Sequence, residues 1–306
     1  MYGEFFGLHE LPFGSSPDPR FLYMTPEIRE CLASLQYGIA TRKGFVVLTG
    51  PVGSGKTTLL KTVLGTFSKE RVSSSFVFNS SLDVLDLLEF ILADFGIVPA
   101  SRTKSGMLLQ LNRWLIERYN NRGLCVIVVD EAQNLSWQAL EEIRLLTNLE
   151  TTSEKLVQIV LSGQTELETM LYEPSMRQLR QRISLWCKTQ PLTPEQTSAY
   201  ILERLRIAGA TRSIFSLEAF QLVHYYARGI PRVINLLCEH ALLASYVDGV
   251  KFVSASAVEL VGIELGFHMP FPVSTSAESD YSNSREKSIS VKPIEDATAS
   301  LRGQEI

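Results

Sequence analysis

The chain has few cysteines, and none of them form a closely spaced pair. Cys31, Cys125, Cys187 and Cys238 are spread over 306 residues, with no CxxC among them. Zinc ribbons and dithiol redox motifs need closely spaced pairs, and disulfide frameworks need a higher cysteine density. We therefore expect four reduced, buried thiols in a cytosolic protein.

Long apolar runs are also missing. A membrane-spanning helix needs about 18 apolar residues in a row, and no such run occurs. The N-terminus, MYGEFFGLHELPFG, lacks the basic start and apolar stretch of a secretory signal. We predict no transmembrane segment and a location in the cytoplasm, with attachment at the periphery of the inner membrane left open.

The charge excess is small. A net charge of −4 gives no overall signal for nucleic acid, although it leaves room for a local basic patch. Hydrophobic residues make up 45% of the chain and charged residues 20%, an ordinary globular balance. A chain of 306 residues is long enough for one large or two modest domains with a substantial core.

Apolar strands alternate with amphipathic helices up to residue 190. After an ordered loop over the first 25 residues, Thr25 caps a helix and Pro26 takes its first position. The expected strands are 45–50, 75–79, 124–132, 156–164 and 183–192, and the expected helices are 25–44, 56–67, 82–97 and 107–123. This alternation predicts an α/β fold with a mainly parallel sheet covered by helices on both faces.

The pattern changes after Pro191. Four short helices with capping residues at their starts are expected at 193–210, 216–229, 231–249 and 254–265. From about residue 267 the chain is rich in Ser, Pro and charge without apolar periodicity, which predicts disorder. The predicted organisation is an α/β domain over 1–190, a small all-helical domain over 191–266 and a disordered tail over 267–306.

A phosphate-binding loop follows the first predicted strand. The stretch GPVGSGKTT fits G-x-x-x-x-G-K-[ST] and lies between a strand and a helix, as the motif requires. Its candidate ligand-binding residues are Gly50, Pro51, Val52, Gly53, Ser54, Gly55, Lys56, Thr57 and Thr58. The glycines let backbone amides approach phosphate oxygens, Lys56 supplies charge to the β- and γ-phosphates, and the Thr57 hydroxyl ligates Mg²⁺.

Two acids end the strand CVIVVDEA. At the carboxyl edge of a parallel sheet, Asp130 is a candidate for holding Mg²⁺, and Glu131 for taking a proton from the attacking water. A small-molecule kinase is the weaker alternative, because the second acid favours water as the acceptor. Acids that merely cap a strand end are the structural alternative.

Polar and basic side chains follow the later strands. Gln164 ends the strand LVQIVLSGQ and is a candidate contact for the attacking water or the γ-phosphate. Arg177, Arg180 and Arg182 precede the last strand, and one of them could reach a neighbouring subunit's nucleotide, with Arg180 and Arg182 the favoured pair. A solvated basic face and a nucleic-acid phosphate contact remain the alternatives.

An arginine also begins a late helix. Gly229, Ile230 and Pro231 make a tight entry to the helix on which Arg232 is the next residue. If the helical domain covers the nucleotide cleft, Arg232 reaches the γ-phosphate and distinguishes ATP from ADP. A plain surface arginine is the alternative.

Together these residues resemble the AAA+ ATPases. Walker A covers Gly50 to Thr57, Walker B is Asp130 and Glu131, sensor 1 is Gln164 and sensor 2 is Arg232. More narrowly, the chain is similar to the ExeA/GspA group of general-secretion ATPases over about residues 2–265. The stretches that carry this resemblance are FFGLHELPFGSSPDPRFLYMTPEIRECLASLQYGI, GFVVLTGPVGSGKTTLL, VVDEAQNLS, EEIRLLTNLET, VLSGQTEL, RQRI and GIPRVINLLCEHAL.

The resemblance implies an AAA+ core with a helical lid, ATP and Mg²⁺ as ligands, a homo-oligomer, and a partner in assembly of a secretion, pilus or exopolysaccharide export complex. The alternatives are a TniB-like transposition ATPase acting on DNA, which is not favoured, and a nucleotide-gated scaffold with little turnover. Relatives often carry other residues than Pro51 and Val52 in the loop, and we expect nucleotide binding to survive the difference. They also often continue into a peptidoglycan-binding domain, which the polar tail does not resemble.

Overall fold

We describe a computed structural model of the chain, which covers residues 2–68, 70–78 and 82–267. The predicted disordered tail lies outside these residues, apart from Phe267. Within the described ranges, no helix has both the length and the hydrophobicity that a membrane crossing requires.

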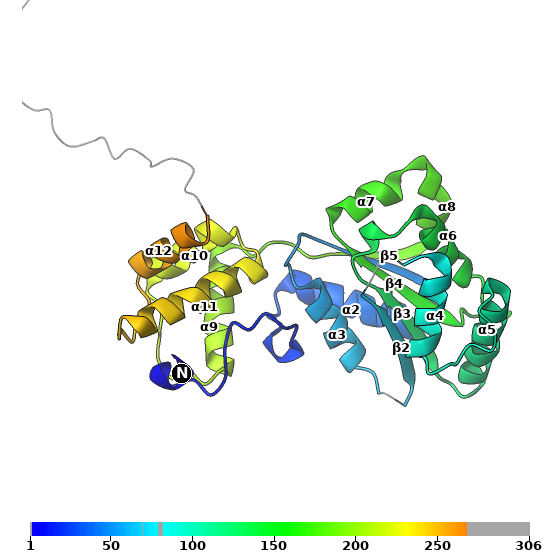
Figure 1. The fold of residues 1–306 in the computed structure, drawn as a ribbon, viewed down its shortest axis with the longest axis horizontal. Coiled ribbons are helices and arrows are strands. Elements are labelled where there is room, and N and C mark those ends of the chain that lie inside the picture. Colours follow the sequence, from blue (N-terminus) through cyan, green and yellow to red (C-terminus); the bar gives the residue numbers. More distant parts are fainter. Residues whose placement is uncertain (1, 69, 79–81, 268–306) are drawn as a thin grey trace, which may run out of the picture. The chain divides into compact units, whose positions relative to one another are not determined.

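Five parallel strands form one sheet in the order β2-β3-β4-β1-β5 (Figure 1). Their bounds are Phe45–Thr49 for β1, Val72–Val77 for β2, Leu124–Val129 for β3, Val157–Gly163 for β4 and Ile183–Lys188 for β5. The prediction of β2 at 75–79 is displaced because its first four residues, VSSS, include three serines, as an edge strand allows. The parallel sheet itself is confirmed.

Helices cover both faces of this sheet (Figure 1). One face packs against α2 (Pro26–Ala40) and α3 (Lys56–Gly65). The other packs against α4 (Val84–Asp94), α5 (Lys104–Asn120) and α6 (Trp137–Leu146). Helix α6 was not predicted, nor were α7 (Thr165–Tyr172), α8 (Arg177–Arg180) and the short helices η2 (Ala132–Asn134) and η3 (Pro174–Met176).

The later helices share a separate apolar cluster. They are α9 (Pro194–Ile207), α10 (Leu217–Ala227), α11 (Pro231–Val247) and α12 (Ala255–Glu264), coloured yellow-green to orange in Figure 1. The N-terminal segment joins this cluster, because Tyr2, Phe6, Leu8 and Phe13 are buried in it. This segment was expected to be a loop, but it contains α1 (Tyr2–Phe6) and the short helix η1 (Pro19–Phe21).

Polar contacts fix the N-terminal segment to the same helices. The Tyr2 hydroxyl donates to Glu239 on α11 (2.7 Å), and the buried Arg204 of α9 donates to the carbonyl of Pro12 (2.5 Å). The Arg204 guanidinium also lies over the ring of Phe21, 4.5 Å from its centroid. The chain therefore connects the helical cluster to the sheet twice, just before α2 and just after β5.

Candidate nucleotide-binding site

The phosphate-binding loop joins β1 to α3. Gly53 and Gly55 adopt positive φ angles of 75° and 93°, a region that favours glycine. Gly55 is the N-cap of α3 and offers no side chain to the first amides of the helix. Those amides need a partner, and a phosphate at a helix N-terminus is one that suits them.

Lys56 is buried inside this loop, with 5% of its surface exposed. Its Nζ donates to the carbonyls of Gly50 (2.9 Å) and Pro51 (3.1 Å). Burial lowers the pKa of Lys56, against the opposing charges of Glu131 and Asp130. Among the described residues, the partners of the ammonium are backbone oxygens of the loop, which leaves it well suited to an anionic ligand.

Asp130 follows β3 and is buried between two hydroxyl groups. Thr57 Oγ1 donates to its Oδ2 (2.7 Å), and Ser162 Oγ donates to its Oδ1 (2.8 Å). The structure thus brings the two predicted Mg²⁺ ligands, Thr57 and Asp130, into contact. Hydroxyl and carboxylate oxygens are the donor set that Mg²⁺ prefers, so these residues fit the ion.

Glu131 is oriented by two amides. Its backbone is left-handed (φ 51°), and its Oε2 accepts from Gln133 Nε2 (2.6 Å) and Gln164 Nε2 (2.9 Å). Burial raises the pKa of Glu131, but the two amide hydrogen bonds and the charge of Lys56 outweigh this and lower it. Glu131 therefore stays a carboxylate, with its Oε2 oxygen fixed.

Gln133 was missed at the sequence level. It bridges two predicted site residues, because its Oε1 also accepts from the backbone amide of Gln164 (3.1 Å). A side chain at Gly163 would come within 2.7 Å of that same oxygen, so the contact requires glycine there. The available signal was the amide two residues after the acidic pair in DEAQ.

Helix α11 contacts the phosphate-binding loop with its first turn. The Arg232 amide donates to the carbonyl of Gly53 (3.1 Å), and a Cβ added to Gly53 would lie 2.6 Å from the Cβ of Arg232. The side chain of Arg232 is exposed. The structure thus places Arg232 beside the loop, while its predicted contact with a γ-phosphate stays a proposal.

The other predicted arginines are held elsewhere. Arg182 donates to Thr147 Oγ1 and Asn148 Oδ1, both at 2.6 Å. Arg180 donates to the carbonyl of Tyr172 (3.2 Å) and stacks over its ring. Neither arginine contacts the group formed by Lys56, Asp130 and Glu131 in the described residues.

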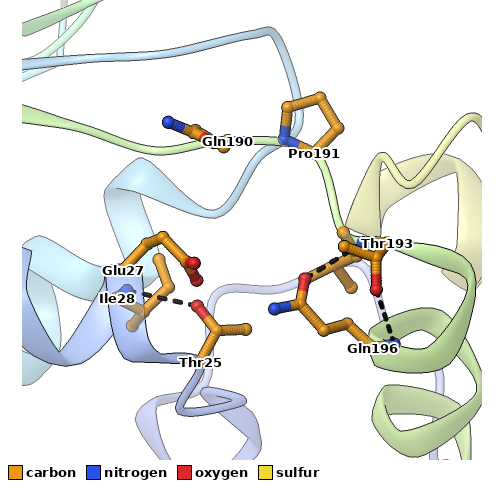
Figure 2. Close-up of a pocket in the computed structure, with 8 residues that line it drawn as sticks. Thr25, Glu27, Ile28, Gln190, Pro191, Thr193 and Gln196 are labelled. Atoms are coloured by element: carbon orange, nitrogen blue, oxygen red, sulfur yellow. Dashed lines mark hydrogen bonds between the residues drawn. The ribbon is translucent and has the colours of Figure 1, made fainter.

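A pocket adjoins the loop, between the start of α2 and the segment after β5 (Figure 2). Its lining residues are Thr25, Glu27, Ile28, Gln190, Pro191, Leu192, Thr193 and Gln196. Thr25 and Thr193 cap the two helices that border it, accepting from the amides of Ile28 (3.2 Å) and Gln196 (3.2 Å). The pocket therefore lies between the starts of two capped helices, and its walls combine polar side chains with Ile28, Pro191 and Leu192.

Thr189 connects this pocket to the phosphate-binding loop. Its amide donates to the carbonyl of Thr49 (2.8 Å), and its hydroxyl is hydrogen-bonded to that of Ser54 (2.6 Å). Gln190, the next residue, already lines the pocket. A ligand with phosphates at the loop could thus extend directly into the pocket.

Comparison with known proteins assigns this site to a family. The AAA domain model matches residues 39–171. General secretion pathway protein A of Aeromonas hydrophila is 41% identical over 266 residues, which cover 87% of this chain. The chain is a AAA+ protein of the ExeA/GspA-like group. It spans about half of that GspA relative, 48% of its length.

Solved structures share the fold of this GspA-like protein. Cdc6p from Pyrobaculum aerophilum superposes with a TM-score of 0.66 at 21% identity, covering 84% of this chain and 71% of its own. The Thermotoga maritima RuvB Holliday junction branch migration motor has a TM-score of 0.53 at 16% identity, covering 79% and 70%. At these identities the likeness concerns the fold alone, and it confirms the predicted P-loop NTPase class.

Proposed function

We propose that this GspA-like protein binds ATP with Mg²⁺ and hydrolyses it to ADP and phosphate. The observation that carries the proposal is the meeting of three groups at the carboxyl ends of β1 and β3, the strands on either side of β4. Lys56 follows β1, the pair formed by Asp130 and Thr57 joins β3 to α3, and Glu131 is held by two amides. Membership of the AAA+ family supports the same activity.

Each group has a separate task in this proposal. The loop amides and Lys56 would bind the phosphates, and Thr57 with Asp130 would hold Mg²⁺, which neutralises phosphate charge when bound. Glu131 would accept the proton of the attacking water, with Gln133 and Gln164 fixing its Oε2 oxygen. Arg232 would contact the γ-phosphate from the first turn of α11.

The pocket beside the loop would hold the adenine base. Thr189 connects the pocket to the phosphate-binding loop, and Gln190 in the segment after β5 and Gln196 on α9 offer hydrogen-bonding groups. The base would then lie between α2 of the sheet region and α9 of the helical cluster (Figure 2). Nucleotide exchange could in this way change how the two groups of helices meet.

The cellular task we propose is assembly of a secretion, pilus or exopolysaccharide export complex by an oligomer of this chain. The similarity to general secretion pathway protein A supports this task. Because the chain spans 48% of that relative, partners bound by the remaining half are not carried over.

The test of the activity uses three proteins. The unchanged chain should take up ATP in calorimetry with Mg²⁺ and release phosphate, whereas Lys56→Ala should lose binding. Glu131→Gln should still bind ATP but lose most turnover, about 100-fold or more. No uptake by the folded, unchanged chain would overturn the proposal.

The partner can be sought with the Glu131→Gln variant saturated with ATP, which should stay in the ATP-bound form. Export or envelope-assembly proteins recovered with this variant, and lost with Lys56→Ala, would support the proposed task. Salt-dependent retention on DNA without such proteins would favour the transposition-type alternative instead.

A further inference from the structure

Two of the four cysteines contact each other between α2 and β5. Cys31 Sγ lies 3.3 Å from the carbonyl of Lys188, and Cys187 Sγ lies 3.9 Å from the carbonyl of Cys31. Both residues are buried, with 5% and 4% of their surface exposed. The Cys187 side chain thus contacts the backbone of Cys31, and the two residues join α2 to the edge strand β5.

The two thiols differ in acidity. The hydrogen bond from Cys187 lowers the pKa of Cys31, and the same contact raises the pKa of Cys187. These directions make the Cys31 sulfur the nucleophile of the two and Cys187 its resolving partner.

The remaining cysteines provide an internal comparison. Burial raises the pKa of Cys125 to about 11 and raises that of Cys238 as well. Neither is hydrogen-bonded to another cysteine in the part of the chain that the structure describes. We therefore expect Cys125 and Cys238 to be inert under conditions that oxidise the pair.

The pair lies next to the nucleotide site. Cys31 is one helical turn after Ile28, which lines the pocket, so both occupy one face of α2. Cys187 is followed by Lys188 and then by Thr189, which contacts Ser54 of the phosphate-binding loop. A covalent bond between the sulfurs would therefore connect α2 to the end of β5, and α2 and the segment that follows β5 both line the pocket.

We propose that Cys31 and Cys187 form a reversible disulfide, a modification site that controls access to the nucleotide pocket. A peroxide is the oxidant. The Cys31 thiolate attacks one peroxide oxygen, the O–O bond breaks, and a sulfenic acid forms as hydroxide leaves. The Cys187 sulfur then attacks the sulfenic sulfur and the S–S bond forms. The sulfenic hydroxyl leaves as water with the proton of the Cys187 thiol. The sum is two thiols and H₂O₂ giving one disulfide and two waters.

The first experiment tests the bond itself. The full chain is treated with limiting hydrogen peroxide, alkylated after unfolding, digested, and analysed by mass spectrometry without reduction. We expect a linked peptide pair containing Cys31 and Cys187, removed by dithiothreitol, forming about 10-fold faster or more than any oxidation of Cys125 or Cys238.

Variants make this result decisive. Cys31→Ser should abolish the linked pair, while the matched change Cys125→Ser should leave it intact. Free thiols at 31 and 187 that persist as long as those at 125 and 238 would overturn the proposal.

The link to nucleotide rests on the proposed function and is tested separately with Mg²⁺ and ADP. ADP should slow formation of the linked pair in the unchanged chain, and the oxidised chain should bind ADP about 10-fold more weakly in calorimetry, a difference of about 1.4 kcal/mol. In the Lys56→Ala variant, the linked pair should form at the same rate in the presence and in the absence of ADP.

The outcomes separate the two proposals. A disulfide that forms normally in a chain that never binds nucleotide would contradict the proposed function but keep the modification site. If the unchanged chain binds ADP, but ADP does not slow formation of the disulfide and the disulfide does not weaken ADP binding, the proposed control of the pocket is overturned.

Discussion

The position of Glu131 depends on its own backbone and on one neighbouring glycine. A left-handed φ of 51° turns the residue out of the line of β3, and two amides then hold its carboxylate. Gly163 leaves the room that Gln133 needs to reach both Glu131 and the amide of Gln164. Gln133 therefore helps to fix where the proposed base lies.

The first prediction concerns this amide. Gln133→Ala should lower phosphate release about 10-fold and leave ATP affinity unchanged, because it removes orientation of Glu131 but no ligand contact. Phosphate release and calorimetry measure the two quantities. The matched control is Gln138→Ala, an exposed glutamine on α6, which should behave as the unchanged chain. Equal turnover in both variants would show that Gln133 does not position Glu131.

At the scale of elements, the entry to α11 depends on close packing against the segment after β5. A Cβ at Gly229 would lie 2.1 Å from the carbonyl oxygen of Leu192, and the Leu192 amide donates to the Gly229 carbonyl (2.8 Å). The turn before α11 and the segment that lines the pocket therefore fix each other, and with them the first turn that meets the phosphate-binding loop.

This contact gives a second prediction with a control in the same chain. Gly229 and Gly249 both have positive φ, 74° and 70°, but no atom lies within 4 Å of a Cβ at Gly249. Gly249→Ala should lower the free energy of unfolding by about 1 kcal/mol through backbone strain alone. Gly229→Ala should cost at least about 2 kcal/mol more, because overpacking is added. Urea unfolding measures both, and equal losses would contradict the close packing.

A third prediction concerns the attachment of the N-terminal segment to α9. Arg204→Ala leaves the Pro12 carbonyl without its donor and the Phe21 ring without its cation, so unfolding should become easier by about 3 kcal/mol. Arg206→Ala, which removes an exposed ion pair with Glu203, should leave the stability nearly unchanged. Thermal unfolding of both variants provides the test. Similar melting temperatures would mean that Arg204 is not needed to hold the segment.

At the scale of the whole molecule, Arg182, which lies between α8 and β5, distinguishes a site made by one chain from a site shared between two chains. Arg182 has its hydrogen-bond partners at Thr147 and Asn148, away from the proposed nucleotide of its own chain. A catalytic contribution from this residue therefore requires a second copy of the chain.

The fourth prediction tests that sharing. Arg182→Ala and Glu131→Gln should each hydrolyse ATP poorly, since an arginine acting between subunits contributes about 10³-fold or more. Their mixture should regain measurable phosphate release, because mixed neighbours combine an intact Glu131 with an intact Arg182. Activity of the mixture equal to the average of the two variants would show that Arg182 does not act between subunits.

The structural features that could be predicted from the sequence are those determined by residues close together in the chain. The apolar strands, the helix capped by Thr25 and the loop GPVGSGKTT carry their patterns within a few residues, and the fold class followed from them. The N-terminal segment was expected to be a loop because its partners lie at the other end of the chain, as the contact between Tyr2 and Glu239 illustrates. Gln133 was missed because its role depends on the bend at Glu131, which no local pattern encodes.

The double connection between the helical cluster and the sheet has a mechanical consequence. Two covalent connections leave the helical cluster one rotation relative to the sheet, about the line that joins them, and the hydrogen bond from the Arg232 amide to the Gly53 carbonyl restrains it. Here the attachments are the residues before α2 and those after β5, and both border the pocket in Figure 2. A ligand bound in this pocket would lie on the axis of that rotation. A small change of angle there would therefore move the far ends of α11 and α12 by a larger distance.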